Sequence, residues 1–393
     1  MVHDGHIGSK RRYSIAAAIV CNAINAIGLS IALPLLSVIL AERGASGLMI
    51  GLIAAMSGIA TLIVAPFAGV LVHRLGVVAS LIGSITVSAA SFFAFYFAEP
   101  FWLWFVLRFL NGAALALTLV ASEFWINALV PARRRGLVTG LYVAIQSVGF
   151  VIGPIILVLI GSRGALPFAT GTGLMLLAVF PALLGAGAAP VTQNTPRRGA
   201  AIAFLLATPI ATFAAFVFGA LEGGMNLLPV YGMHVGESET IAILLPAAVA
   251  LGNLFLQVPI GLLSDKVDRR KVIMACAAVG VMAALLMPIS ARDIWSFFAV
   301  LFVWGGVVAA LYSVGLALLE GSYSGSKLAT ANAAFVMLYS AGRLVGPPLV
   351  GASIDYWNPH GFAAMMALFP AIYLAVAAFN WIRPDPAQAR GVR

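Results

Sequence analysis

The sequence contains little charge: only 9% of its 393 residues are Asp, Glu, Lys or Arg, whereas 62% are hydrophobic. A soluble protein of this length must keep most of its surface wettable, so the composition excludes an ordinary soluble fold. The apolar residues gather in repeated long runs, and about 20 such residues are enough to cross a bilayer as a helix. The composition therefore predicts an integral membrane protein.

Signals for metal binding and catalysis are also scarce. The two cysteines, Cys21 and Cys276, fall inside apolar runs, where we interpret them as small buried side chains rather than as a disulfide or metal ligands. The sequence contains no P-loop, no H-E-x-x-H pair and no nucleophile elbow. The five histidines lie in loops or near segment ends: His3, His6, His73, His234 and His360. We therefore expect no metal, no cofactor and no enzyme activity.

The long apolar runs define the expected fold. Backbone groups must pair with one another in lipid, and these runs are too long and too uniformly apolar for barrel strands, so we expect helices. Cutting at charged or Pro/Gly-rich breaks predicts an all-α membrane protein with twelve transmembrane helices, at residues 13–40, 48–72, 77–97, 102–130, 137–160, 165–188, 201–231, 240–263, 272–291, 294–320, 330–352 and 360–381.

The cations indicate an orientation in the membrane. The net charge of +9 does not suggest nucleic-acid binding, because Lys and Arg occur in short bursts between the apolar runs. Most of the 22 Lys and Arg residues fall in alternate loops on the side of the N-terminus. The positive-inside rule then predicts a multi-pass protein of the plasma (cell inner) membrane, with both termini in the cytoplasm.

The chain also repeats itself. The polar stretch 189–200, APVTQNTPRRGA, divides it into predicted six-helix halves at 1–188 and 201–393. GVLVHRLG, from Gly69, pairs with GLLSDKVD, from Gly261, and GFVIGP pairs with GRLVGP at nearly the same separation. Internal repeats of this kind indicate a secondary transporter whose central site lies between its halves.

The repeated motifs resemble those of the major facilitator superfamily. Residues 261–271, GLLSDKVDRRK, are similar to the family's loop signature G-x-L-x-D-R-x-G-R-(K/R). The first copy keeps Gly69, Arg74 and Gly76 but has His73 where the family usually has Asp. The stretches 122–127 and 257–261 are similar to a poorly characterised bacterial efflux-like branch of the family. The resemblance implies two six-helix bundles that transport by alternating access, in a functional monomer.

Two further motifs carry the resemblance. Residues 107–112, LRFLNG, resemble the arginine–glycine motif associated with proton coupling, which assigns that role to Arg108. Gly149, Gly153 and Pro154 resemble the core of the antiporter motif, although 157–158 is Leu-Val where a glycine pair is expected. We interpret these glycines and the proline, with Gly346 and Pro347 of the second copy, as packing and hinge features.

The charged loop 261–271 admits two interpretations. Asp265 at a helix N-terminus, with Arg269 and Arg270 at helix C-termini, would hold neighbouring helix ends together in one transport state. Alternatively, the cations are only a positive-inside anchor beside anionic lipid. His73 either gives the first copy a pH-sensitive contact or simply leaves that copy with one contact fewer.

Charges inside the membrane are costly and therefore point to function. We predict that Glu222 carries a proton and that Arg108 is its electrostatic partner; a static ion pair is the alternative. Glu123 competes for the proton-carrying role, in a polar cluster with Trp125 and Asn127. Arg343 needs an anion, which is either a buried carboxylate or an anionic substrate.

Uncharged polar residues complete the predicted site. Each alone could equally join helices, but together they would give an apolar pocket a few orienting hydrogen bonds. The predicted substrate-binding residues are Asn22, Asn25, Gln146, Asn226, Gln257 and Arg343.

The function expected from these features is proton-coupled export of small amphipathic compounds, driven by the proton gradient. The first alternative is a proton symporter that imports a small metabolite, with Arg343 binding an anionic group. A non-transporting membrane sensor or scaffold is the second alternative. The identity of the cargo does not follow from the sequence, since one fold serves many cargoes.

Overall fold

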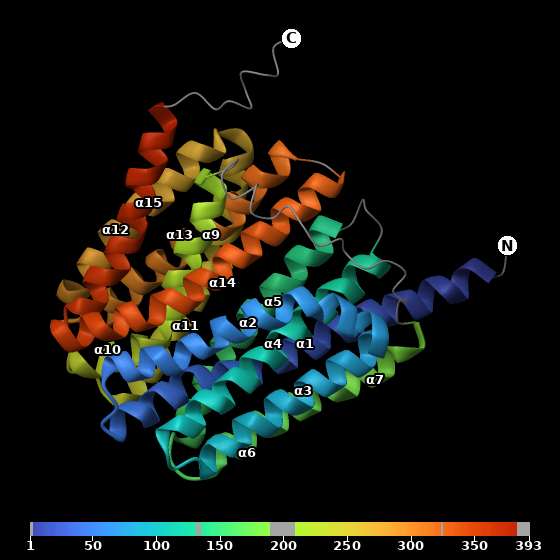
Figure 1. Ribbon diagram of the computed structural model, residues 1–393, viewed down its shortest axis with the longest axis horizontal. Coiled ribbons are helices and arrows are strands. Elements are labelled where there is room, and N and C mark those ends of the chain that lie inside the picture. Colours follow the sequence, from blue (N-terminus) through green and yellow to red (C-terminus); the bar gives the residue numbers. More distant parts are fainter. Residues whose placement is uncertain (1–2, 131–134, 189–208, 324, 383–393) are drawn as a thin grey trace. The chain divides into compact units, whose positions relative to one another are not determined.

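The computed structural model describes residues 3–130, 135–188, 209–323 and 325–382, and every regular element within these ranges is a helix (Figure 1). In the first half the elements are α1 (His3–Glu42), α2 (Gly47–Leu75), α3 (Val77–Ala94), η1 (Phe95–Phe97), α4 (Phe101–Leu129), α5 (Arg135–Ile160), α6 (Leu166–Leu177), α7 (Val179–Gly185) and η3 (Ala186–Ala188). The second half contains α9 (Pro209–Gly224), η4 (Met225–Leu227), α10 (Leu228–His234), α11 (Glu239–Lys266), α12 (Arg269–Ser290), α13 (Ile294–Ser322), α14 (Gly325–Tyr356) and α15 (Gly361–Ile382).

Eleven helical stretches of the described chain are long and apolar enough to cross a membrane, and a shorter apolar helix runs over Ala144–Ile160. The expectation of helices rather than strands is confirmed for the described residues. The count of twelve transmembrane helices stays a prediction. The predicted segment 165–188 is interrupted at Ala178, between α6 and α7. In the segment 201–231, α9 ends at the paired glycines Gly223 and Gly224 and continues through a 3-10 turn.

The described chain forms two compact units. Unit 1 contains Met1–Gly44, Met56–Arg197 and Glu239–Ala247, and unit 2 contains Ala45–Ala55, Arg198–Ser238 and Ala248–Arg393. The first turns of α2 therefore cluster with unit 2, and those of α11 with unit 1. The predicted halves 1–188 and 201–393 stay a prediction, and the linker 189–200 lies outside the described residues.

In unit 1, α1 packs along α5, α6 and α7. Glycines of α5 allow this close approach: a Cβ atom on Gly153 would lie 1.8 Å from the Ser30 hydroxyl oxygen. That hydroxyl donates a 2.9 Å hydrogen bond to the carbonyl oxygen of Gly149. Small residues and a short polar side chain thus join two membrane helices, as is usual where lipid offers no hydrophobic driving force for association.

In unit 2, α9 and α14 lie side by side (Figure 1) and pack closely along their lengths. Glycines on both helices bring the backbones together. A Cβ atom on Gly219 would lie 2.0 Å from the Tyr339 carbonyl oxygen, and one on Gly342 would lie 2.0 Å from that of Phe216. This contact holds the C-terminal turns of α9, including Glu222, against the middle of α14.

Candidate functional site

The predicted proton carrier, Glu222, lies near the end of α9 within the candidate membrane span Ile210–His234. Its side chain is half-buried. The hydroxyl group of Tyr339, on α14, donates a hydrogen bond to Oε2 of Glu222. A carboxylate placed inside a membrane span is costly unless it is paired, so this contact marks the pair as a candidate functional site.

Arg343 lies one helical turn beyond Tyr339 on α14. The Cζ atom of its guanidinium is 5.8 Å from the centroid of the Tyr339 ring. Its charge interacts electrostatically with that of Glu222, yet the two side chains form no direct ion pair in the described part of the chain. Its Nε atom is buried and has no hydrogen-bond partner among the described residues. The two opposite charges are therefore near each other and connected through Tyr339.

Aromatic rings surround this group. The ring of Phe218 on α9 stacks on that of Tyr339 at 5.9 Å between centroids. Tyr312 on α13 meets Tyr339 edge-on at 5.5 Å and also contacts Phe218 at 5.4 Å. Phe218 and Tyr312 therefore pack around the ring of Tyr339, the residue that lies between Glu222 and Arg343.

Two predicted proton-coupling residues lie elsewhere. Arg108, on α4, is buried, with 6% of its surface exposed. It belongs to unit 1 and Glu222 to unit 2, so their pairing stays a prediction. Glu123, also on α4, is exposed. Trp125 is fully buried and donates to the Ser14 hydroxyl at 2.9 Å, whereas the side chain of Asn127 lies outside the described residues.

The predicted substrate-binding residues are divided between the units. Asn22 and Asn25 lie on α1 of unit 1 with 5% and 3% of their surfaces exposed, and the buried Nδ2 and Oδ1 atoms, respectively, have no hydrogen-bond partners among the described residues. Gln146 of unit 1 and Gln257 of unit 2 are half-buried. Asn226 donates a 2.7 Å hydrogen bond to the Gly223 carbonyl. The assignment of these residues to a substrate stays a prediction.

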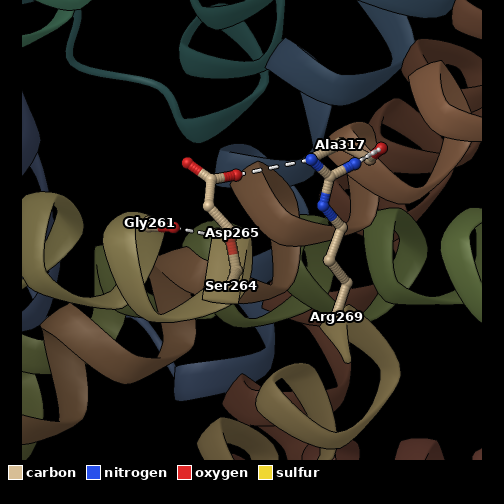
Figure 2. Close-up of polar contacts among 5 residues, drawn as sticks. All are labelled: Gly261, Ser264, Asp265, Arg269 and Ala317. Carbon is tan, nitrogen blue, oxygen red and sulfur yellow. Dashed lines mark hydrogen bonds and ion pairs between the residues drawn. The ribbon is translucent and has the colours of Figure 1, made fainter. Parts of the chain in front are cut away.

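Residues of the charged loop 261–271 make polar contacts with one another and with Ala317 of α13, as Figure 2 shows. Arg269, at the start of α12, donates from Nη1 to the Ala317 carbonyl of α13 at 2.6 Å. Its Nη2 atom lies 3.4 Å from Oδ1 of Asp265, on α11. The same turn contains a hydrogen bond from the Ser264 hydroxyl to the Gly261 carbonyl, at 2.8 Å. The loop therefore joins the neighbouring ends of α11, α12 and α13.

Two assignments in this loop were wrong. Arg269 and Arg270 do not lie at a helix C-terminus but in the first turn of α12, which begins at Arg269. Asp265 does not lie at a helix N-terminus but in the last turn of α11, with 67% of its side chain exposed. Asp268 is the residue that caps α12, and its carboxylate accepts a 2.9 Å hydrogen bond from the backbone N–H of Arg270. Because α11 continues to Lys266, Asp265 lies inside that helix. Asp268 is the carboxylate that directly precedes the first turn of α12, whose backbone N–H groups need a cap.

The first copy of the loop is simpler. His73 and Arg74 are exposed in the last turn of α2. Gly76 alone separates α2 from α3, with φ of 83°, a conformation that glycine adopts without strain. Gly69 and Gly261 are half-buried within their helices.

The motif GRLVGP, which is the second copy of GFVIGP, packs closely against α9. A Cβ atom on Gly346 would lie 2.1 Å from the Ala220 carbonyl oxygen, which supports the interpretation of Gly346 as a packing residue. Pro154 and Pro347 lie inside α5 and α14.

Sequence reasoning missed Tyr339. One signal was present, because Tyr339 precedes Arg343 by four residues and therefore shares its helix face. No metal site emerges among the described residues, since no group of three or more His, Cys, Asp and Glu side chains is placed to hold an ion. The site is thus a carboxylate, a hydroxyl and a guanidinium within an aromatic surrounding, a set suited to binding and releasing protons.

Comparison with known proteins identifies relatives over most of the chain. The sequence model of the Major Facilitator Superfamily matches residues 18–253 and 212–393. An uncharacterized MFS-type transporter of Bacillus subtilis (strain 168), YfkF, is 26% identical over 324 residues, which cover 80% of this chain and 82% of the relative. A second uncharacterized MFS-type transporter, YcaD of Escherichia fergusonii, is 26% identical over 321 residues, covering 79% and 81%.

Solved structures show the same fold. The nucleoside transporter NupG aligns with a TM-score of 0.75 at 15% identity, over 94% of this chain and 98% of that chain. A bacterial homolog of the human lysosomal transporter Spinster, in an inward-facing and unoccupied conformation, aligns with a TM-score of 0.73 at 15% identity, over 95% of both chains. At these identities the likeness concerns the fold and not the cargo.

Proposed function

The chain belongs to the Major Facilitator Superfamily, and from this membership we propose that it exports small amphipathic compounds in exchange for protons. Its relatives are named transporters, so it is a multi-pass membrane transporter rather than an enzyme. Proton coupling, export and the cargo class are the proposed parts. Protons supply the energy, membrane lipids surround the chain, and a monomer suffices for transport.

The Glu222–Tyr339 contact carries the proton-coupling proposal. A carboxylate that is half-buried inside a membrane span can change its charge, and Tyr339 and Arg343 supply groups that stabilise the charged form. Binding of a proton would remove that charge and weaken the contact between α9 and α14. Such a change couples proton uptake to the packing of two helices, which is what a proton-driven transporter needs.

The aromatic rings packed around Tyr339 favour amphipathic cargo, because apolar pockets with a few polar groups bind such compounds. Arg343 supports the alternative, a proton symporter that imports a small anionic metabolite, because its buried Nε atom has no hydrogen-bond partner in the described part of the chain. The structural neighbours do not decide between the two, since their names describe a nucleoside transporter and a Spinster homolog.

Everted membrane vesicles with an acidified interior test the proposal. The probes are a panel of fluorescent amphipathic compounds, with fluorescent organic anions as a second panel. We expect at least one amphipathic compound to accumulate inside, and accumulation to collapse when an ionophore removes the pH gradient. A symporter would instead take up an anion only when the proton gradient is reversed. Failure of every amphipathic compound, with correctly inserted protein, would count against the proposed cargo class.

Two matched variants test the proton carrier. Glu222→Gln keeps the size and hydrogen bonding of the side chain but cannot ionise, so we expect it to abolish proton-driven accumulation. Glu123→Gln is the matched control, because it removes an exposed carboxylate from α4. If Glu123→Gln abolishes accumulation and Glu222→Gln does not, the proton carrier is Glu123. Full activity in both variants would refute the proton-carrying role for both residues.

A further inference from the structure

Tyr339 is bonded to Glu222 through its hydroxyl group and contacts Arg343 through its ring. We propose that Tyr339 is a positioning residue that sets the proton affinity of Glu222, by donating a hydrogen bond to its carboxylate while keeping the Arg343 guanidinium from forming an ion pair with it. This inference rests on the proposed function, in which Glu222 carries the proton.

The hydroxyl group favours the ionised carboxylate. An O–H group that donates to a carboxylate forms a charge-assisted hydrogen bond, which is stronger than one between neutral groups. When Glu222 binds a proton from solution, the carboxylate becomes a neutral acid and this charge-assisted bond is lost. The Tyr339 hydroxyl therefore opposes protonation of Glu222, and its removal makes protonation easier.

The ring of Tyr339 has the opposite effect. The α14 backbone at Arg343 lies close to α9, since a Cβ atom on Gly223 would be 3.2 Å from the Arg343 Cα atom. The guanidinium nevertheless lies over the Tyr339 ring instead of pairing directly with the adjacent Glu222. A direct ion pair between these residues would hold the carboxylate in its ionised form and lock the two helices together. The ring thus keeps Glu222 able to accept a proton.

Few other described groups are placed to influence the proton affinity of Glu222. On α13, Tyr312 touches the Tyr339 ring. On α15, Tyr373 stacks against Phe213 of α9, and its hydroxyl is buried without a hydrogen-bond partner among the described residues. The turn η4 contributes no titratable side chain. Among the described residues of the elements packed against α9, the cation in electrostatic contact with Glu222 is Arg343.

Substitution of Tyr339 by two different residues separates the two effects. Tyr339→Phe removes the hydroxyl and keeps the ring, so Glu222 should hold its proton to higher pH, by about one pH unit for one charge-assisted hydrogen bond. Tyr339→Ala also removes the ring, which admits the guanidinium and water, so Glu222 should lose its proton at lower pH than in Tyr339→Phe. Tyr373→Phe is the control, because it removes a buried tyrosine hydroxyl that has no hydrogen-bond partner within the described ranges, and we expect no change.

Infrared difference spectroscopy of the purified chain measures this without a known cargo. The carboxylic-acid C=O band that disappears in Glu222→Gln is followed as a function of pH in the natural chain and the three tyrosine variants. A midpoint that is raised in Tyr339→Phe, and that is lower in Tyr339→Ala than in Tyr339→Phe, supports the proposal. An unchanged midpoint in Tyr339→Phe, or equal shifts in both variants, would overturn it.

The same experiment separates this inference from the proposed function. If the natural chain shows no band that depends on Glu222, the carboxylate does not titrate and the proton-carrier assignment itself fails. If the band titrates and Glu222→Gln abolishes proton-driven accumulation, but Tyr339→Phe leaves the midpoint unchanged, only the role of Tyr339 fails. Tyr339→Phe retains the ring contacts with Phe218 and Tyr312, so we expect it to keep the fold. A shift of its midpoint would therefore not result from unfolding.

Discussion

The guanidinium of Arg269 donates from Nη1 to the carbonyl oxygen of Ala317 at 2.6 Å, joining the first turn of α12 to the last turns of α13 (Figure 2). The ion pair between Arg269 and Asp265 is exposed and 3.4 Å long, so it contributes little to the stability of the fold. The carbonyl contact is therefore the part of the loop that stabilises the fold. A simple positive-inside anchor would need the charge of Arg269 but not this contact.

Two alanine variants distinguish a helix clamp from a topological anchor. Arg269→Ala and Lys271→Ala each remove one cation from the same loop, but Lys271 is exposed at the start of α12. We expect Arg269→Ala to lower the thermal midpoint of the purified protein, by a stability loss of about 2 kcal/mol for a hydrogen bond from a charged donor. Lys271→Ala should leave it unchanged. Equal effects of the two variants would favour the anchor.

A second contact to test lies at the start of α2. The Asp355 carboxylate accepts hydrogen bonds from the backbone N–H groups of Gly47 at 2.7 Å and Leu48 at 2.8 Å, within unit 2. Asp355→Ala leaves these donors uncapped, at a cost of about 1 kcal/mol. We expect local opening of this turn to rise about fivefold, seen as faster maleimide labelling of Ile50→Cys, whose native side chain is only 2% exposed.

The control for this prediction is another cap with the same chemistry. Asp293 caps α13 by accepting from the Ser296 backbone N–H at 2.9 Å. Asp293→Ala should not change the labelling of Ile50→Cys, because it uncaps a different helix. The natural cysteines, Cys21 and Cys276, are both buried and give little background. Equal labelling in the natural and Asp355→Ala backgrounds would show that Asp355 does not hold the α2 terminus.

The close approach of α9 and α14 gives a third prediction. A Cβ atom in Gly219→Ala would lie 2.0 Å from the Tyr339 carbonyl oxygen, a rigid backbone atom, so the helices must separate. Replacing glycine by alanine inside a helix normally stabilises the helix by about 1 kcal/mol. At Gly219 we expect the opposite, a loss of stability. Gly173→Ala on α6 is the matched control, because its Cβ atom meets nothing within 4 Å. Thermal midpoints should fall for Gly219→Ala and stay level or rise for Gly173→Ala.

The sequence predicted the helices well because each apolar run is long enough to dictate its own structure in lipid. Contacts between helices were harder to predict. Depth alone suggested Arg108 as the partner of Glu222, and that pairing stays a prediction. The contact of Tyr339 with Glu222 was missed, because it depends on glycines that let α9 and α14 touch. Asp265 was assigned a cap that belongs to Asp268, since the two carboxylates differ only in where α11 ends. Such outcomes depend on helix ends and packing, which composition does not fix.

The last prediction concerns a buried chain of hydrogen bonds in unit 1. The indole N–H of Trp125 on α4 donates to the Ser14 hydroxyl of α1 at 2.9 Å, and that hydroxyl donates to the Gly185 carbonyl of α7 at 3.0 Å. All three groups are buried, so breaking one link leaves another polar group without its partner. Ser14→Ala and Trp125→Phe should therefore each destabilise the protein, and their effects should not add.

A double-mutant cycle on thermal stability measures this coupling. Once one link is broken, loss of the second group costs less, so Ser14→Ala combined with Trp125→Phe should be more stable than the sum of the single losses predicts, by about 1 kcal/mol. Ser84→Ala is a suitable third substitution, because it breaks a separate buried contact, with Thr118 at 2.8 Å. Its effect should add to that of Trp125→Phe. Full additivity between Ser14→Ala and Trp125→Phe would mean that the three helices are held by packing alone and that the hydrogen-bond chain is incidental.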